Sequence, residues 1–305
     1  MDLALTDDQT AIIDAVDSLT RPYAAPALHD AGMALVSDEL DRALADGGFL
    51  DIAFDPDLGP VTAALLVERL ARLPYAVEAA ASALVRPLLG EVARPLCLVE
   101  AGRREPLVRF LRPGATVVVV GGTSVTSFTA TAEQVRPEPL ALFAYPVATL
   151  LGDSAGDPLD VSPDEIRTRW RVGLAAEAAG LLAGALDSAV THVSERQQFG
   201  RAIATFQAVR HRLAEAQVRA NGVYWLAMKA AATLDAGDAA LAALHAQESA
   251  RATVYDFHQF LGAMGMTLEH PLHLWTYRLK ALTAELGGRG PQALAAAEAV
   301  WRRQV

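Results

Sequence analysis

The chain has 305 residues, of which 52% are apolar and 20% are charged, and its formal net charge is −10. This length allows a large buried core divided over roughly two or three domains, and the composition is globular rather than disordered. The acidic charge argues against a general nucleic-acid binder, which needs a basic face to neutralise phosphates. A phosphate-bearing ligand is still possible, because a few well-placed arginines can bind it.

The cysteine content and the hydropathy of the chain indicate in which cellular compartment the protein is expected. Cys97 is the only cysteine, which excludes an internal disulfide and a cysteine-based metal cluster. The N-terminal stretch MDLALTDDQT has acids where a signal peptide would have a basic region. The apolar stretch 173–186 contains Glu177 and falls short of the ~18 apolar residues of a membrane span. We therefore expect a soluble, cytoplasmic protein without a membrane segment.

The first part of the chain has helical patterns. Residues 5–19 begin with Thr6 as a predicted N-cap and Gln9 at the capping-box position, followed by apolar residues at helical spacing. Further helical or alanine-rich segments are expected at 37–46, 61–72 and Val77 to Leu89. These patterns predict a helical domain over residues 1–92.

The middle of the chain has strand-like patterns, whereas the end of the chain has helical ones. Short β-branched or aromatic runs predict strands in a small, barrel-like β domain over 93–165, at 96–100, 116–120, 123–130 and 140–147. Four long helical segments with short breaks then predict an antiparallel four-helix bundle over 166–305, at 164–195, 205–234, 238–263 and 270–286. The chain is thus expected to be mainly α with a small β domain.

Two motifs carry a family resemblance. ERQQFGRAIATFQAVRHRLAE at 195–215 resembles the Arg-x-x-Phe-Gly … Phe-Gln … Leu-Ala segment of the acyl-CoA dehydrogenase family of flavoenzymes. HQFLGAMGMTLEHPLHLWTYRLKAL at 258–282 resembles that family's Gln-x-x-Gly-Gly-x-Gly … Glu-x-Pro … Arg segment. Their order and distance, and the helix–sheet–bundle order, are similar over nearly the whole chain. The resemblance implies the acyl-CoA dehydrogenase fold, an acyl-CoA substrate and FAD.

The first motif surrounds a break between two helices. Gly200 is expected to end the first helix in a left-handed cap, and a second helix from about Thr205 would place Gln207 in its first turn, across the break from Arg196. Guanidinium groups and helix N-termini both bind pyrophosphate, although an ordinary helix–turn–helix junction has the same residue types. The resemblance implies that Arg196, Phe199 and Gln207 contact the adenosine-diphosphate end of a FAD held by a neighbouring subunit.

The second motif contributes Gln259 and Gly262 to the same predicted cofactor site. The family usually has two adjacent glycines here, which let the backbone approach the dinucleotide closely, whereas this chain has Ala263 at the second position. The alternative interpretation is a small-residue packing face that also includes Gly265. The EHPLH stretch at 269–273 is interpreted as a capped helix start, and no metal is expected.

The family's dehydrogenation needs a carboxylate that removes the α-proton while the flavin accepts hydride. At the two places where the family puts this base, the chain has Trp170 and Gly287. The nearest acids, Glu285, Glu177 and Asp187, are interpreted as solvated or helix-pairing side chains. On a regular helix Glu285 lies roughly 200° from residue 287, at about 100° per residue, so we expect it to point away from a pocket that residue 287 faces.

The family's own-subunit flavin motifs are also missing. The Thr-Glu-Pro-Gly-Ala-Gly-Ser-Asp run and the Trp-x-Thr-Asn strand have no counterpart after 96–102 or 116–122. The chain therefore resembles the shortened, base-free subunit of a heteromeric, FAD-dependent acyl-CoA dehydrogenase, of the bacterial type that acts on steroid side-chain CoA thioesters. Its implied partner is a longer, base-bearing subunit in an α2β2 heterotetramer. Two alternatives are a self-sufficient homomeric dehydrogenase that uses Glu285, and a flavin-free scaffold of the same fold.

Overall fold

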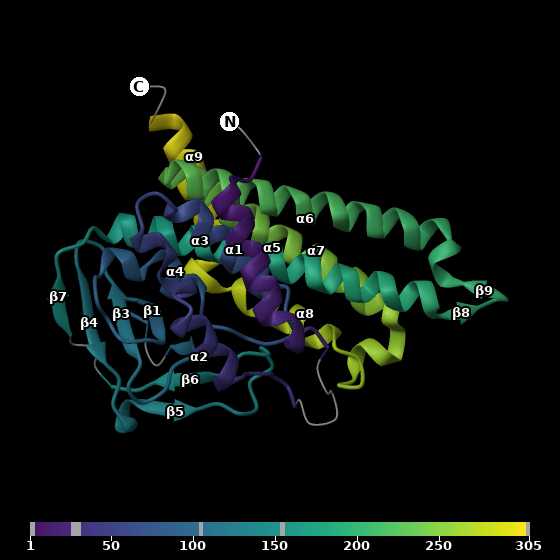
Figure 1. The fold of residues 1–305 in the computed structure, drawn as a ribbon, viewed down its shortest axis with the longest axis horizontal. Coiled ribbons are helices and arrows are strands. Elements are labelled where there is room, and N and C mark those ends of the chain that lie inside the picture. The colour runs from purple at the N-terminus through teal and green to yellow at the C-terminus, as the bar shows by residue number, and fades with distance from the viewer. Residues whose placement is uncertain (1–3, 26–31, 104–105, 153–155, 303–305) are drawn as a thin grey trace.

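The computed structural model describes residues 4–25, 32–103, 106–152 and 156–302. Long helices form a bundle, shorter N-terminal helices pack on it, and two small sheets lie at one of its ends (Figure 1). The opposite end carries a short hairpin. This order of helical, β and helical regions confirms the predicted fold class, whereas the predicted domain boundaries at 92/93 and 165/166 stay predictions.

The N-terminal region consists of helices and short 3-10 turns. Thr6 caps the first helix, because its hydroxyl accepts from the Gln9 N–H and the Gln9 side chain accepts from the Thr6 N–H, which confirms the capping box. The alanine-rich segment from Val77 to Leu89 contains a short helix, which is followed by a 3-10 turn. The elements are α1 (Asp7–Thr20), η1 (Arg21–Tyr23), α2 (Asp38–Asp46), η3 (Phe49–Phe54), α3 (Gly59–Ala71), α4 (Ala80–Leu84) and η4 (Arg86–Leu88).

Two sheets make up the β region. One has the strand order β1-β3-β4-β7, in which β1 and β3 are parallel, and the other has the order β2-β6-β5 and is antiparallel. The strands are β1 (Leu96–Glu100), β2 (Leu107–Arg109), β3 (Thr116–Val120), β4 (Val125–Thr129), β5 (Val135–Pro137), β6 (Val147–Leu150) and β7 (Asp157–Leu159). The strand expected at 140–147 is wrong, because Leu140 is 90% exposed, Ala144 has a φ of 49°, and the strand begins only at Val147.

The C-terminal region has one more helix than predicted. Its elements are α5 (Pro163–Glu195), β8 (Gln197–Gln198), β9 (Arg201–Ala202), η6 (Ile203–Thr205), α6 (Gln207–Thr233), α7 (Ala236–Leu261), η7 (Gly262–Met266), α8 (Leu272–Leu282), η8 (Glu285–Gly287) and α9 (Arg289–Arg302). The unexpected helix α9 packs on α7. The predicted segment 270–286 stops at Leu282 as an α-helix, since Leu286 has a φ of 53° and breaks the helical conformation.

Helix α5 is the centre of the fold. It packs against α3, α6, α7 and α8, so the N-terminal helices and the bundle share one hydrophobic core. Its length and composition would suffice to cross a membrane, but 83% of its most apolar window is buried inside the protein. The apolar character of α5 is therefore explained by its place in the core.

Close packing of α5 depends on small residues. A Cβ added at Gly180 would overlap the backbone carbonyl oxygen of Glu68 and the side chain of Ala71, so α3 could not stay at its present distance. The same addition at Gly290, in the exposed first turn of α9, would meet only open space.

We predict that Gly180→Ala lowers the free energy of unfolding by about 1–3 kcal/mol, because α3 and α5 must move apart. The matched control Gly290→Ala should change stability by no more than about 1 kcal/mol, and in the favourable direction, since alanine favours helix. Urea denaturation measures both, and equal effects of the two variants would contradict this description of the α3–α5 contact.

Candidate functional site

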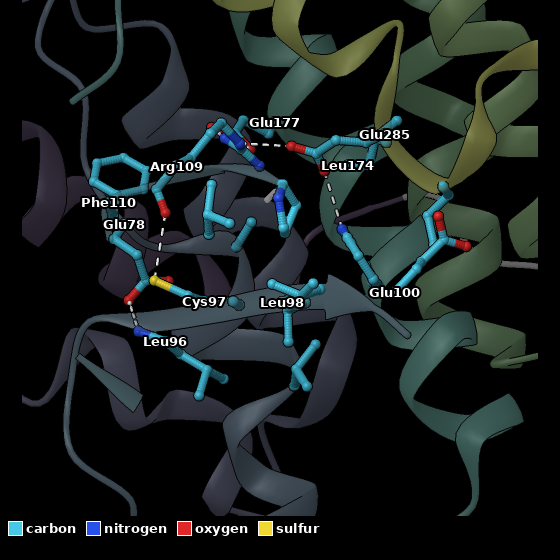
Figure 2. Close-up of a pocket in the computed structure, with 18 of the residues that line it drawn as sticks. Glu78, Leu96, Cys97, Leu98, Glu100, Arg109, Phe110, Leu174, Glu177 and Glu285 are labelled. Carbon is cyan, nitrogen blue, oxygen red and sulfur yellow. Dashed lines mark hydrogen bonds and ion pairs between the residues drawn. The ribbon is translucent and has the colours of Figure 1, made fainter. Parts of the chain in front are cut away.

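A cavity lies between the sheets, the N-terminal part of α5 and the turn η8. Its volume is about 100 Å³. The residues that line it include Cys97 and Val99 of β1, Arg109 of β2, Trp170 and Glu177 of α5, and Glu285 of η8. Figure 2 shows Arg109 and Glu285 pointing toward one another across this cavity.

The structure brings Trp170, one predicted base position, next to Glu285, which lies two residues before the other predicted base position. The indole Nε1 of Trp170 donates to Glu285 Oε2 at 3.0 Å, although the two residues are 115 positions apart. Gly287 does not line the cavity and borders a different hollow. Glu285 and Gly287 thus face different sides, as expected, but Glu285 is the one in the cavity with Trp170. The expectation that Glu285 points away from the cavity is therefore wrong, because residue 287, and not Glu285, is the one that faces away from it.

Arg109 joins two of the carboxylates that line the cavity, Glu177 and Glu285. Its Nη1 lies 3.0 Å and 3.1 Å from the two oxygens of Glu177, and its Nε lies 2.6 Å from Glu285 Oε1. The exposed fractions of these side chains are small: 19% for Arg109, 7% for Glu177 and 17% for Glu285. Charged groups that are mostly buried need partners of opposite charge, and here the Arg109 guanidinium forms ion pairs with two carboxylates.

Tyr145 completes the cluster. Its hydroxyl donates to Glu177 Oε1 at 2.6 Å, and the Arg109 guanidinium lies 4.5 Å from the centre of its ring. Burial, together with the negative charge of Glu177, raises the pKa of Tyr145 well above its ordinary value, so the phenol keeps its proton and acts as a donor. The interpretation of Glu177 as a solvated or helix-pairing acid is therefore wrong, because the residue is 6% exposed and bonded to Arg109 of β2 and to Tyr145.

Arg109, Tyr145, Trp170, Glu177 and Glu285 together form one ion cluster. Both oxygens of Glu285 already accept from a donor, one from Arg109 and one from Trp170. A general base needs an oxygen within hydrogen-bond reach of the proton that it removes, so Glu285 would first have to leave these partners. The arrangement holds elements together and shows no free base.

Sequence reasoning missed Arg109 and Tyr145 and misread Glu177. The signal for Glu177 was present, since a single acid interrupts an otherwise apolar run in a long helix and must find a partner if buried. Its partner Arg109 is 68 residues away in a short strand, and no local pattern connects the two.

The predicted cofactor residues lie at the other end of the bundle (Figure 1). Trp170 and Arg196 are separated by about 39 Å along α5, at about 1.5 Å per residue, so this end is distinct from the cavity. Arg196 and Phe199 are exposed, and Phe199 is 89% accessible at the tip of the hairpin. Among the residues that the structure describes, no carboxylate forms an ion pair with Arg196.

Gly200 does not cap a helix, which corrects the expectation for this residue. Helix α5 ends at Glu195, and the chain then forms the hairpin β8–β9, in which Gln198 pairs with Arg201. Phe199 and Gly200 form its two-residue turn with φ values of 53° and 75°. Two adjacent positive φ values are typical of tight hairpin turns, which explains the glycine and the projection of Phe199 into solvent.

The start of α6 is placed as expected. Gln207 is its first residue, and Phe206 precedes it as an N-cap without a side-chain hydrogen bond to the first turn. The Arg201 guanidinium lies 4.2 Å from the centre of the Phe206 ring, and the Phe199 ring packs edge-on against the same ring. The first-turn N–H groups of α6 are therefore without a capping side chain, next to two exposed arginines.

Gln259 and Gly262 lie at the C-terminal end of α7, and both are exposed. The ring contact between His192 of α5 and His270 shows that the chain following η7 meets the end of α5, so both predicted blocks share one end of the bundle. The packing alternative holds only for Gly265, which is buried, while Gly262 and Ala263 face solvent.

The EHPLH stretch has the predicted role of a helix start. The Leu272 N–H, at the beginning of α8, donates to Nδ1 of His270 at 3.2 Å. Burial, with smaller contributions from two neighbouring histidines, lowers the pKa of His270 to about 4, so the ring is neutral at physiological pH and can accept this bond.

Comparisons with known proteins agree with this fold. The sequence pattern of the acyl-CoA dehydrogenase C-terminal domain matches residues 168–300. The chain is 34% identical over 188 residues to acyl-CoA dehydrogenase FadE34 of Mycobacterium tuberculosis, covering 58% of this chain and 26% of that protein. It is 28% identical over 243 residues to acyl-CoA dehydrogenase IpdE2 of Mycolicibacterium smegmatis, covering 72% of this chain and 75% of that protein.

The chain thus spans about a quarter of FadE34 and three quarters of IpdE2. Among solved structures, the ChsE4-ChsE5 complex of Mycobacterium tuberculosis has a similar fold, with a TM-score of 0.74, 18% identity and 99% coverage of both chains. Residues 168–300 thus match the acyl-CoA dehydrogenase C-terminal domain, both relatives are acyl-CoA dehydrogenases, and the fold of the chain is similar to that of the solved complex.

Proposed function

We propose that the chain is the base-free subunit of a heteromeric, FAD-dependent acyl-CoA dehydrogenase. In this proposal a longer partner subunit holds the flavin and the catalytic carboxylate, in an α2β2 heterotetramer. The chain contributes the exposed end of its bundle to the partner's FAD through Arg196, Phe199, Gln207, Gln259 and Gly262. Steroid side-chain CoA thioesters are the substrate class that we propose from the resemblance.

The observation that carries the proposal is the state of the cavity. The two positions where the resemblance puts the family's base are Trp170 and Gly287, and neither residue has a carboxylate. Gly287, in addition, does not line the cavity. The one acid close to both, Glu285, has both oxygens bonded to Arg109 and Trp170. A volume of about 100 Å³ is also below the several hundred Å³ typical of small-molecule sites.

The exposed end of the bundle fits the diphosphate part of a dinucleotide. Arg196 is exposed and has no ion pair with a carboxylate of the described residues, so its guanidinium is available to a phosphate. The uncapped first turn of α6, which begins with Gln207, supplies N–H donors and the positive end of a 27-residue helix. Gly262 has a φ of 58° and lies exposed beside Gln259, which allows close approach of a ligand to the backbone.

The chemistry is then divided between two subunits. FAD, when bound, accepts hydride from the β-carbon, and a carboxylate of the partner removes the α-proton. This chain orients the dinucleotide and neutralises part of its charge. Its assembly in a complex is supported by the fold shared with the ChsE4-ChsE5 complex.

A second candidate function is a self-sufficient dehydrogenase that uses Glu285. The position of Glu285 in the cavity, beside Trp170, favours this candidate. It requires that substrate binding release Glu285 from Arg109. A third candidate, a flavin-free scaffold, has no specific contact in its favour.

The first prediction concerns Arg196 in the assembled complex. Replacing it by alanine removes a charge-assisted contact worth about 1.5–3 kcal/mol, so FAD affinity should fall by about one to two orders of magnitude without unfolding the bundle. Flavin absorbance after gel filtration measures the retained cofactor. The control Arg136→Ala, on an exposed strand, should retain FAD fully. Unchanged flavin content in Arg196→Ala would show that Arg196 is a solvated surface residue.

The second prediction separates the two enzymatic candidates. Glu285→Gln in the assembled complex should change turnover by less than about threefold, whereas removal of a general base costs about 10²–10⁴-fold. Replacing the corresponding carboxylate of the partner should abolish turnover. A loss of a hundredfold or more in Glu285→Gln, with flavin still bound, would make this chain a catalytic subunit and overturn the proposal.

A further inference from the structure

Four of the seven histidines lie together where α5 and α7 end and α8 begins. This histidine cluster consists of His192 of α5, His258 of α7, His270, and His273 of α8. Residues 262–271, all described by the structure and here named the connecting segment, join α7 to α8, and Gly265 is their only buried member. A segment with so few buried apolar contacts is held in place mainly by its hydrogen bonds to the helices.

Three rings of the cluster make these hydrogen bonds. The Nδ1 of His258 lies 2.7 Å from the carbonyl oxygen of Gly265. The Nδ1 of His273 lies 2.9 Å from the carbonyl oxygen of His270. A carbonyl oxygen only accepts, so both of these nitrogens carry a proton. The Nδ1 of His270, in contrast, accepts from the Leu272 N–H at 3.2 Å and therefore carries none.

A further proton on His270 or His273 is incompatible with the closed segment. His273 is 2% exposed, and its Nε2 is buried without a hydrogen-bond partner in the structure, so a proton there would be a buried donor without an acceptor. A proton on Nδ1 of His270 would break the bond to Leu272. Both costs disappear when the segment opens and water solvates the rings. The closed segment therefore binds fewer protons than the open one.

The groups at the end of α5 also favour neutral rings. Burial, together with the positive charge of Arg196, lowers the pKa of His192, while the negative charge of Glu195 acts in the opposite direction. The rings of His192 and His270 lie 5.4 Å apart, edge to face. Burial, with smaller contributions from His192 and His273, lowers the pKa of His270 to about 4.

The groups on α7, α8 and the segment itself do not offset this. Burial lowers the pKa of His258, against the effect of its hydrogen bond to Gly265. The Tyr277 ring of α8 lies 6.1 Å from the His258 ring, and Glu269 is exposed. Within the described part of the chain, no carboxylate forms an ion pair with any ring of the cluster.

We propose that the neutral rings of the histidine cluster keep the connecting segment closed and that a fall in pH opens it. Because the pKa of His270 in the closed state, about 4, lies below the ordinary value of 6.5, its stabilising contribution is complete above pH 6.5 and is lost as the pH falls toward 4. The equilibrium constant for opening should then rise about tenfold for each pH unit in this window.

The switch belongs to the chain alone, whereas its consequence for FAD rests on the function proposed above. Gly262 begins the connecting segment and Gln259 lies three residues before it, so opening would displace two of the proposed flavin contacts. Histidine protonation that shifts a segment between two arrangements is a general form of pH sensing.

The test is hydrogen–deuterium exchange of the full chain at about pH 7.5 and about pH 5, corrected for the intrinsic effect of pH on exchange. The opening constant of residues 262–271 should rise about tenfold or more at the lower pH, while that of β3 stays unchanged. In His270→Asn/His273→Gln the side chains keep an acceptor and a donor but cannot take up a proton, so the rise should be less than about threefold. The control His211→Asn, at an exposed position on α6, should keep the full rise.

A second readout uses the unmodified chain and does not depend on any variant. In NMR spectra of ring-labelled histidine, His270 should titrate at least about one pH unit below the ordinary value of 6.5. The proposal is overturned if the corrected exchange of residues 262–271 does not change with pH, or if the double variant keeps the full rise. If the double variant exchanges rapidly at both pH values, the NMR titration decides, and titration of His270 at 6.5 with the segment still protected overturns the proposal.

Discussion

The buried ion cluster around Arg109 is the constraint on which the rest of the site depends. Arg109 comes from a three-residue strand, Glu177 from the centre of the bundle and Glu285 from the turn before α9. Removing one partner of a buried pair generally costs about 3–5 kcal/mol, because the other charge is left without compensation. The sheets, α5 and the η8 turn are therefore held in one arrangement, which also includes Trp170, one of the two predicted base positions.

The two ends of α5 consequently have different properties. At its N-terminal end, polar groups are buried and satisfy one another. At its C-terminal end, Arg196 and Phe199 are exposed and the first turn of α6 lacks a side-chain cap. A 33-residue helix keeps these two environments apart at a fixed distance. Exposed cations and the N–H groups of an uncapped helix start can bind a phosphate, and we therefore propose the cofactor contact at this end.

Local signals predicted much of the fold. The capping box at Thr6, the strands 96–100 and 116–120, and the long helices were visible because each depends on residues near in sequence. Helix α9 was missed because Gly287, Gly288 and Pro291 resemble a chain break, although glycine and proline also begin helices. The ion cluster could not be predicted, since Arg109 and Glu285 are joined only by tertiary packing.

The most direct measurement of the central claim is the flavin content of the purified chain, alone and with its longer partner. If the chain completes a site that the partner holds, the isolated chain should show no flavin absorbance above background. The co-purified complex should contain one flavin per pair of subunits. Stoichiometric FAD in the isolated chain, stable to gel filtration, would contradict the account, because it would require a complete flavin site within this chain.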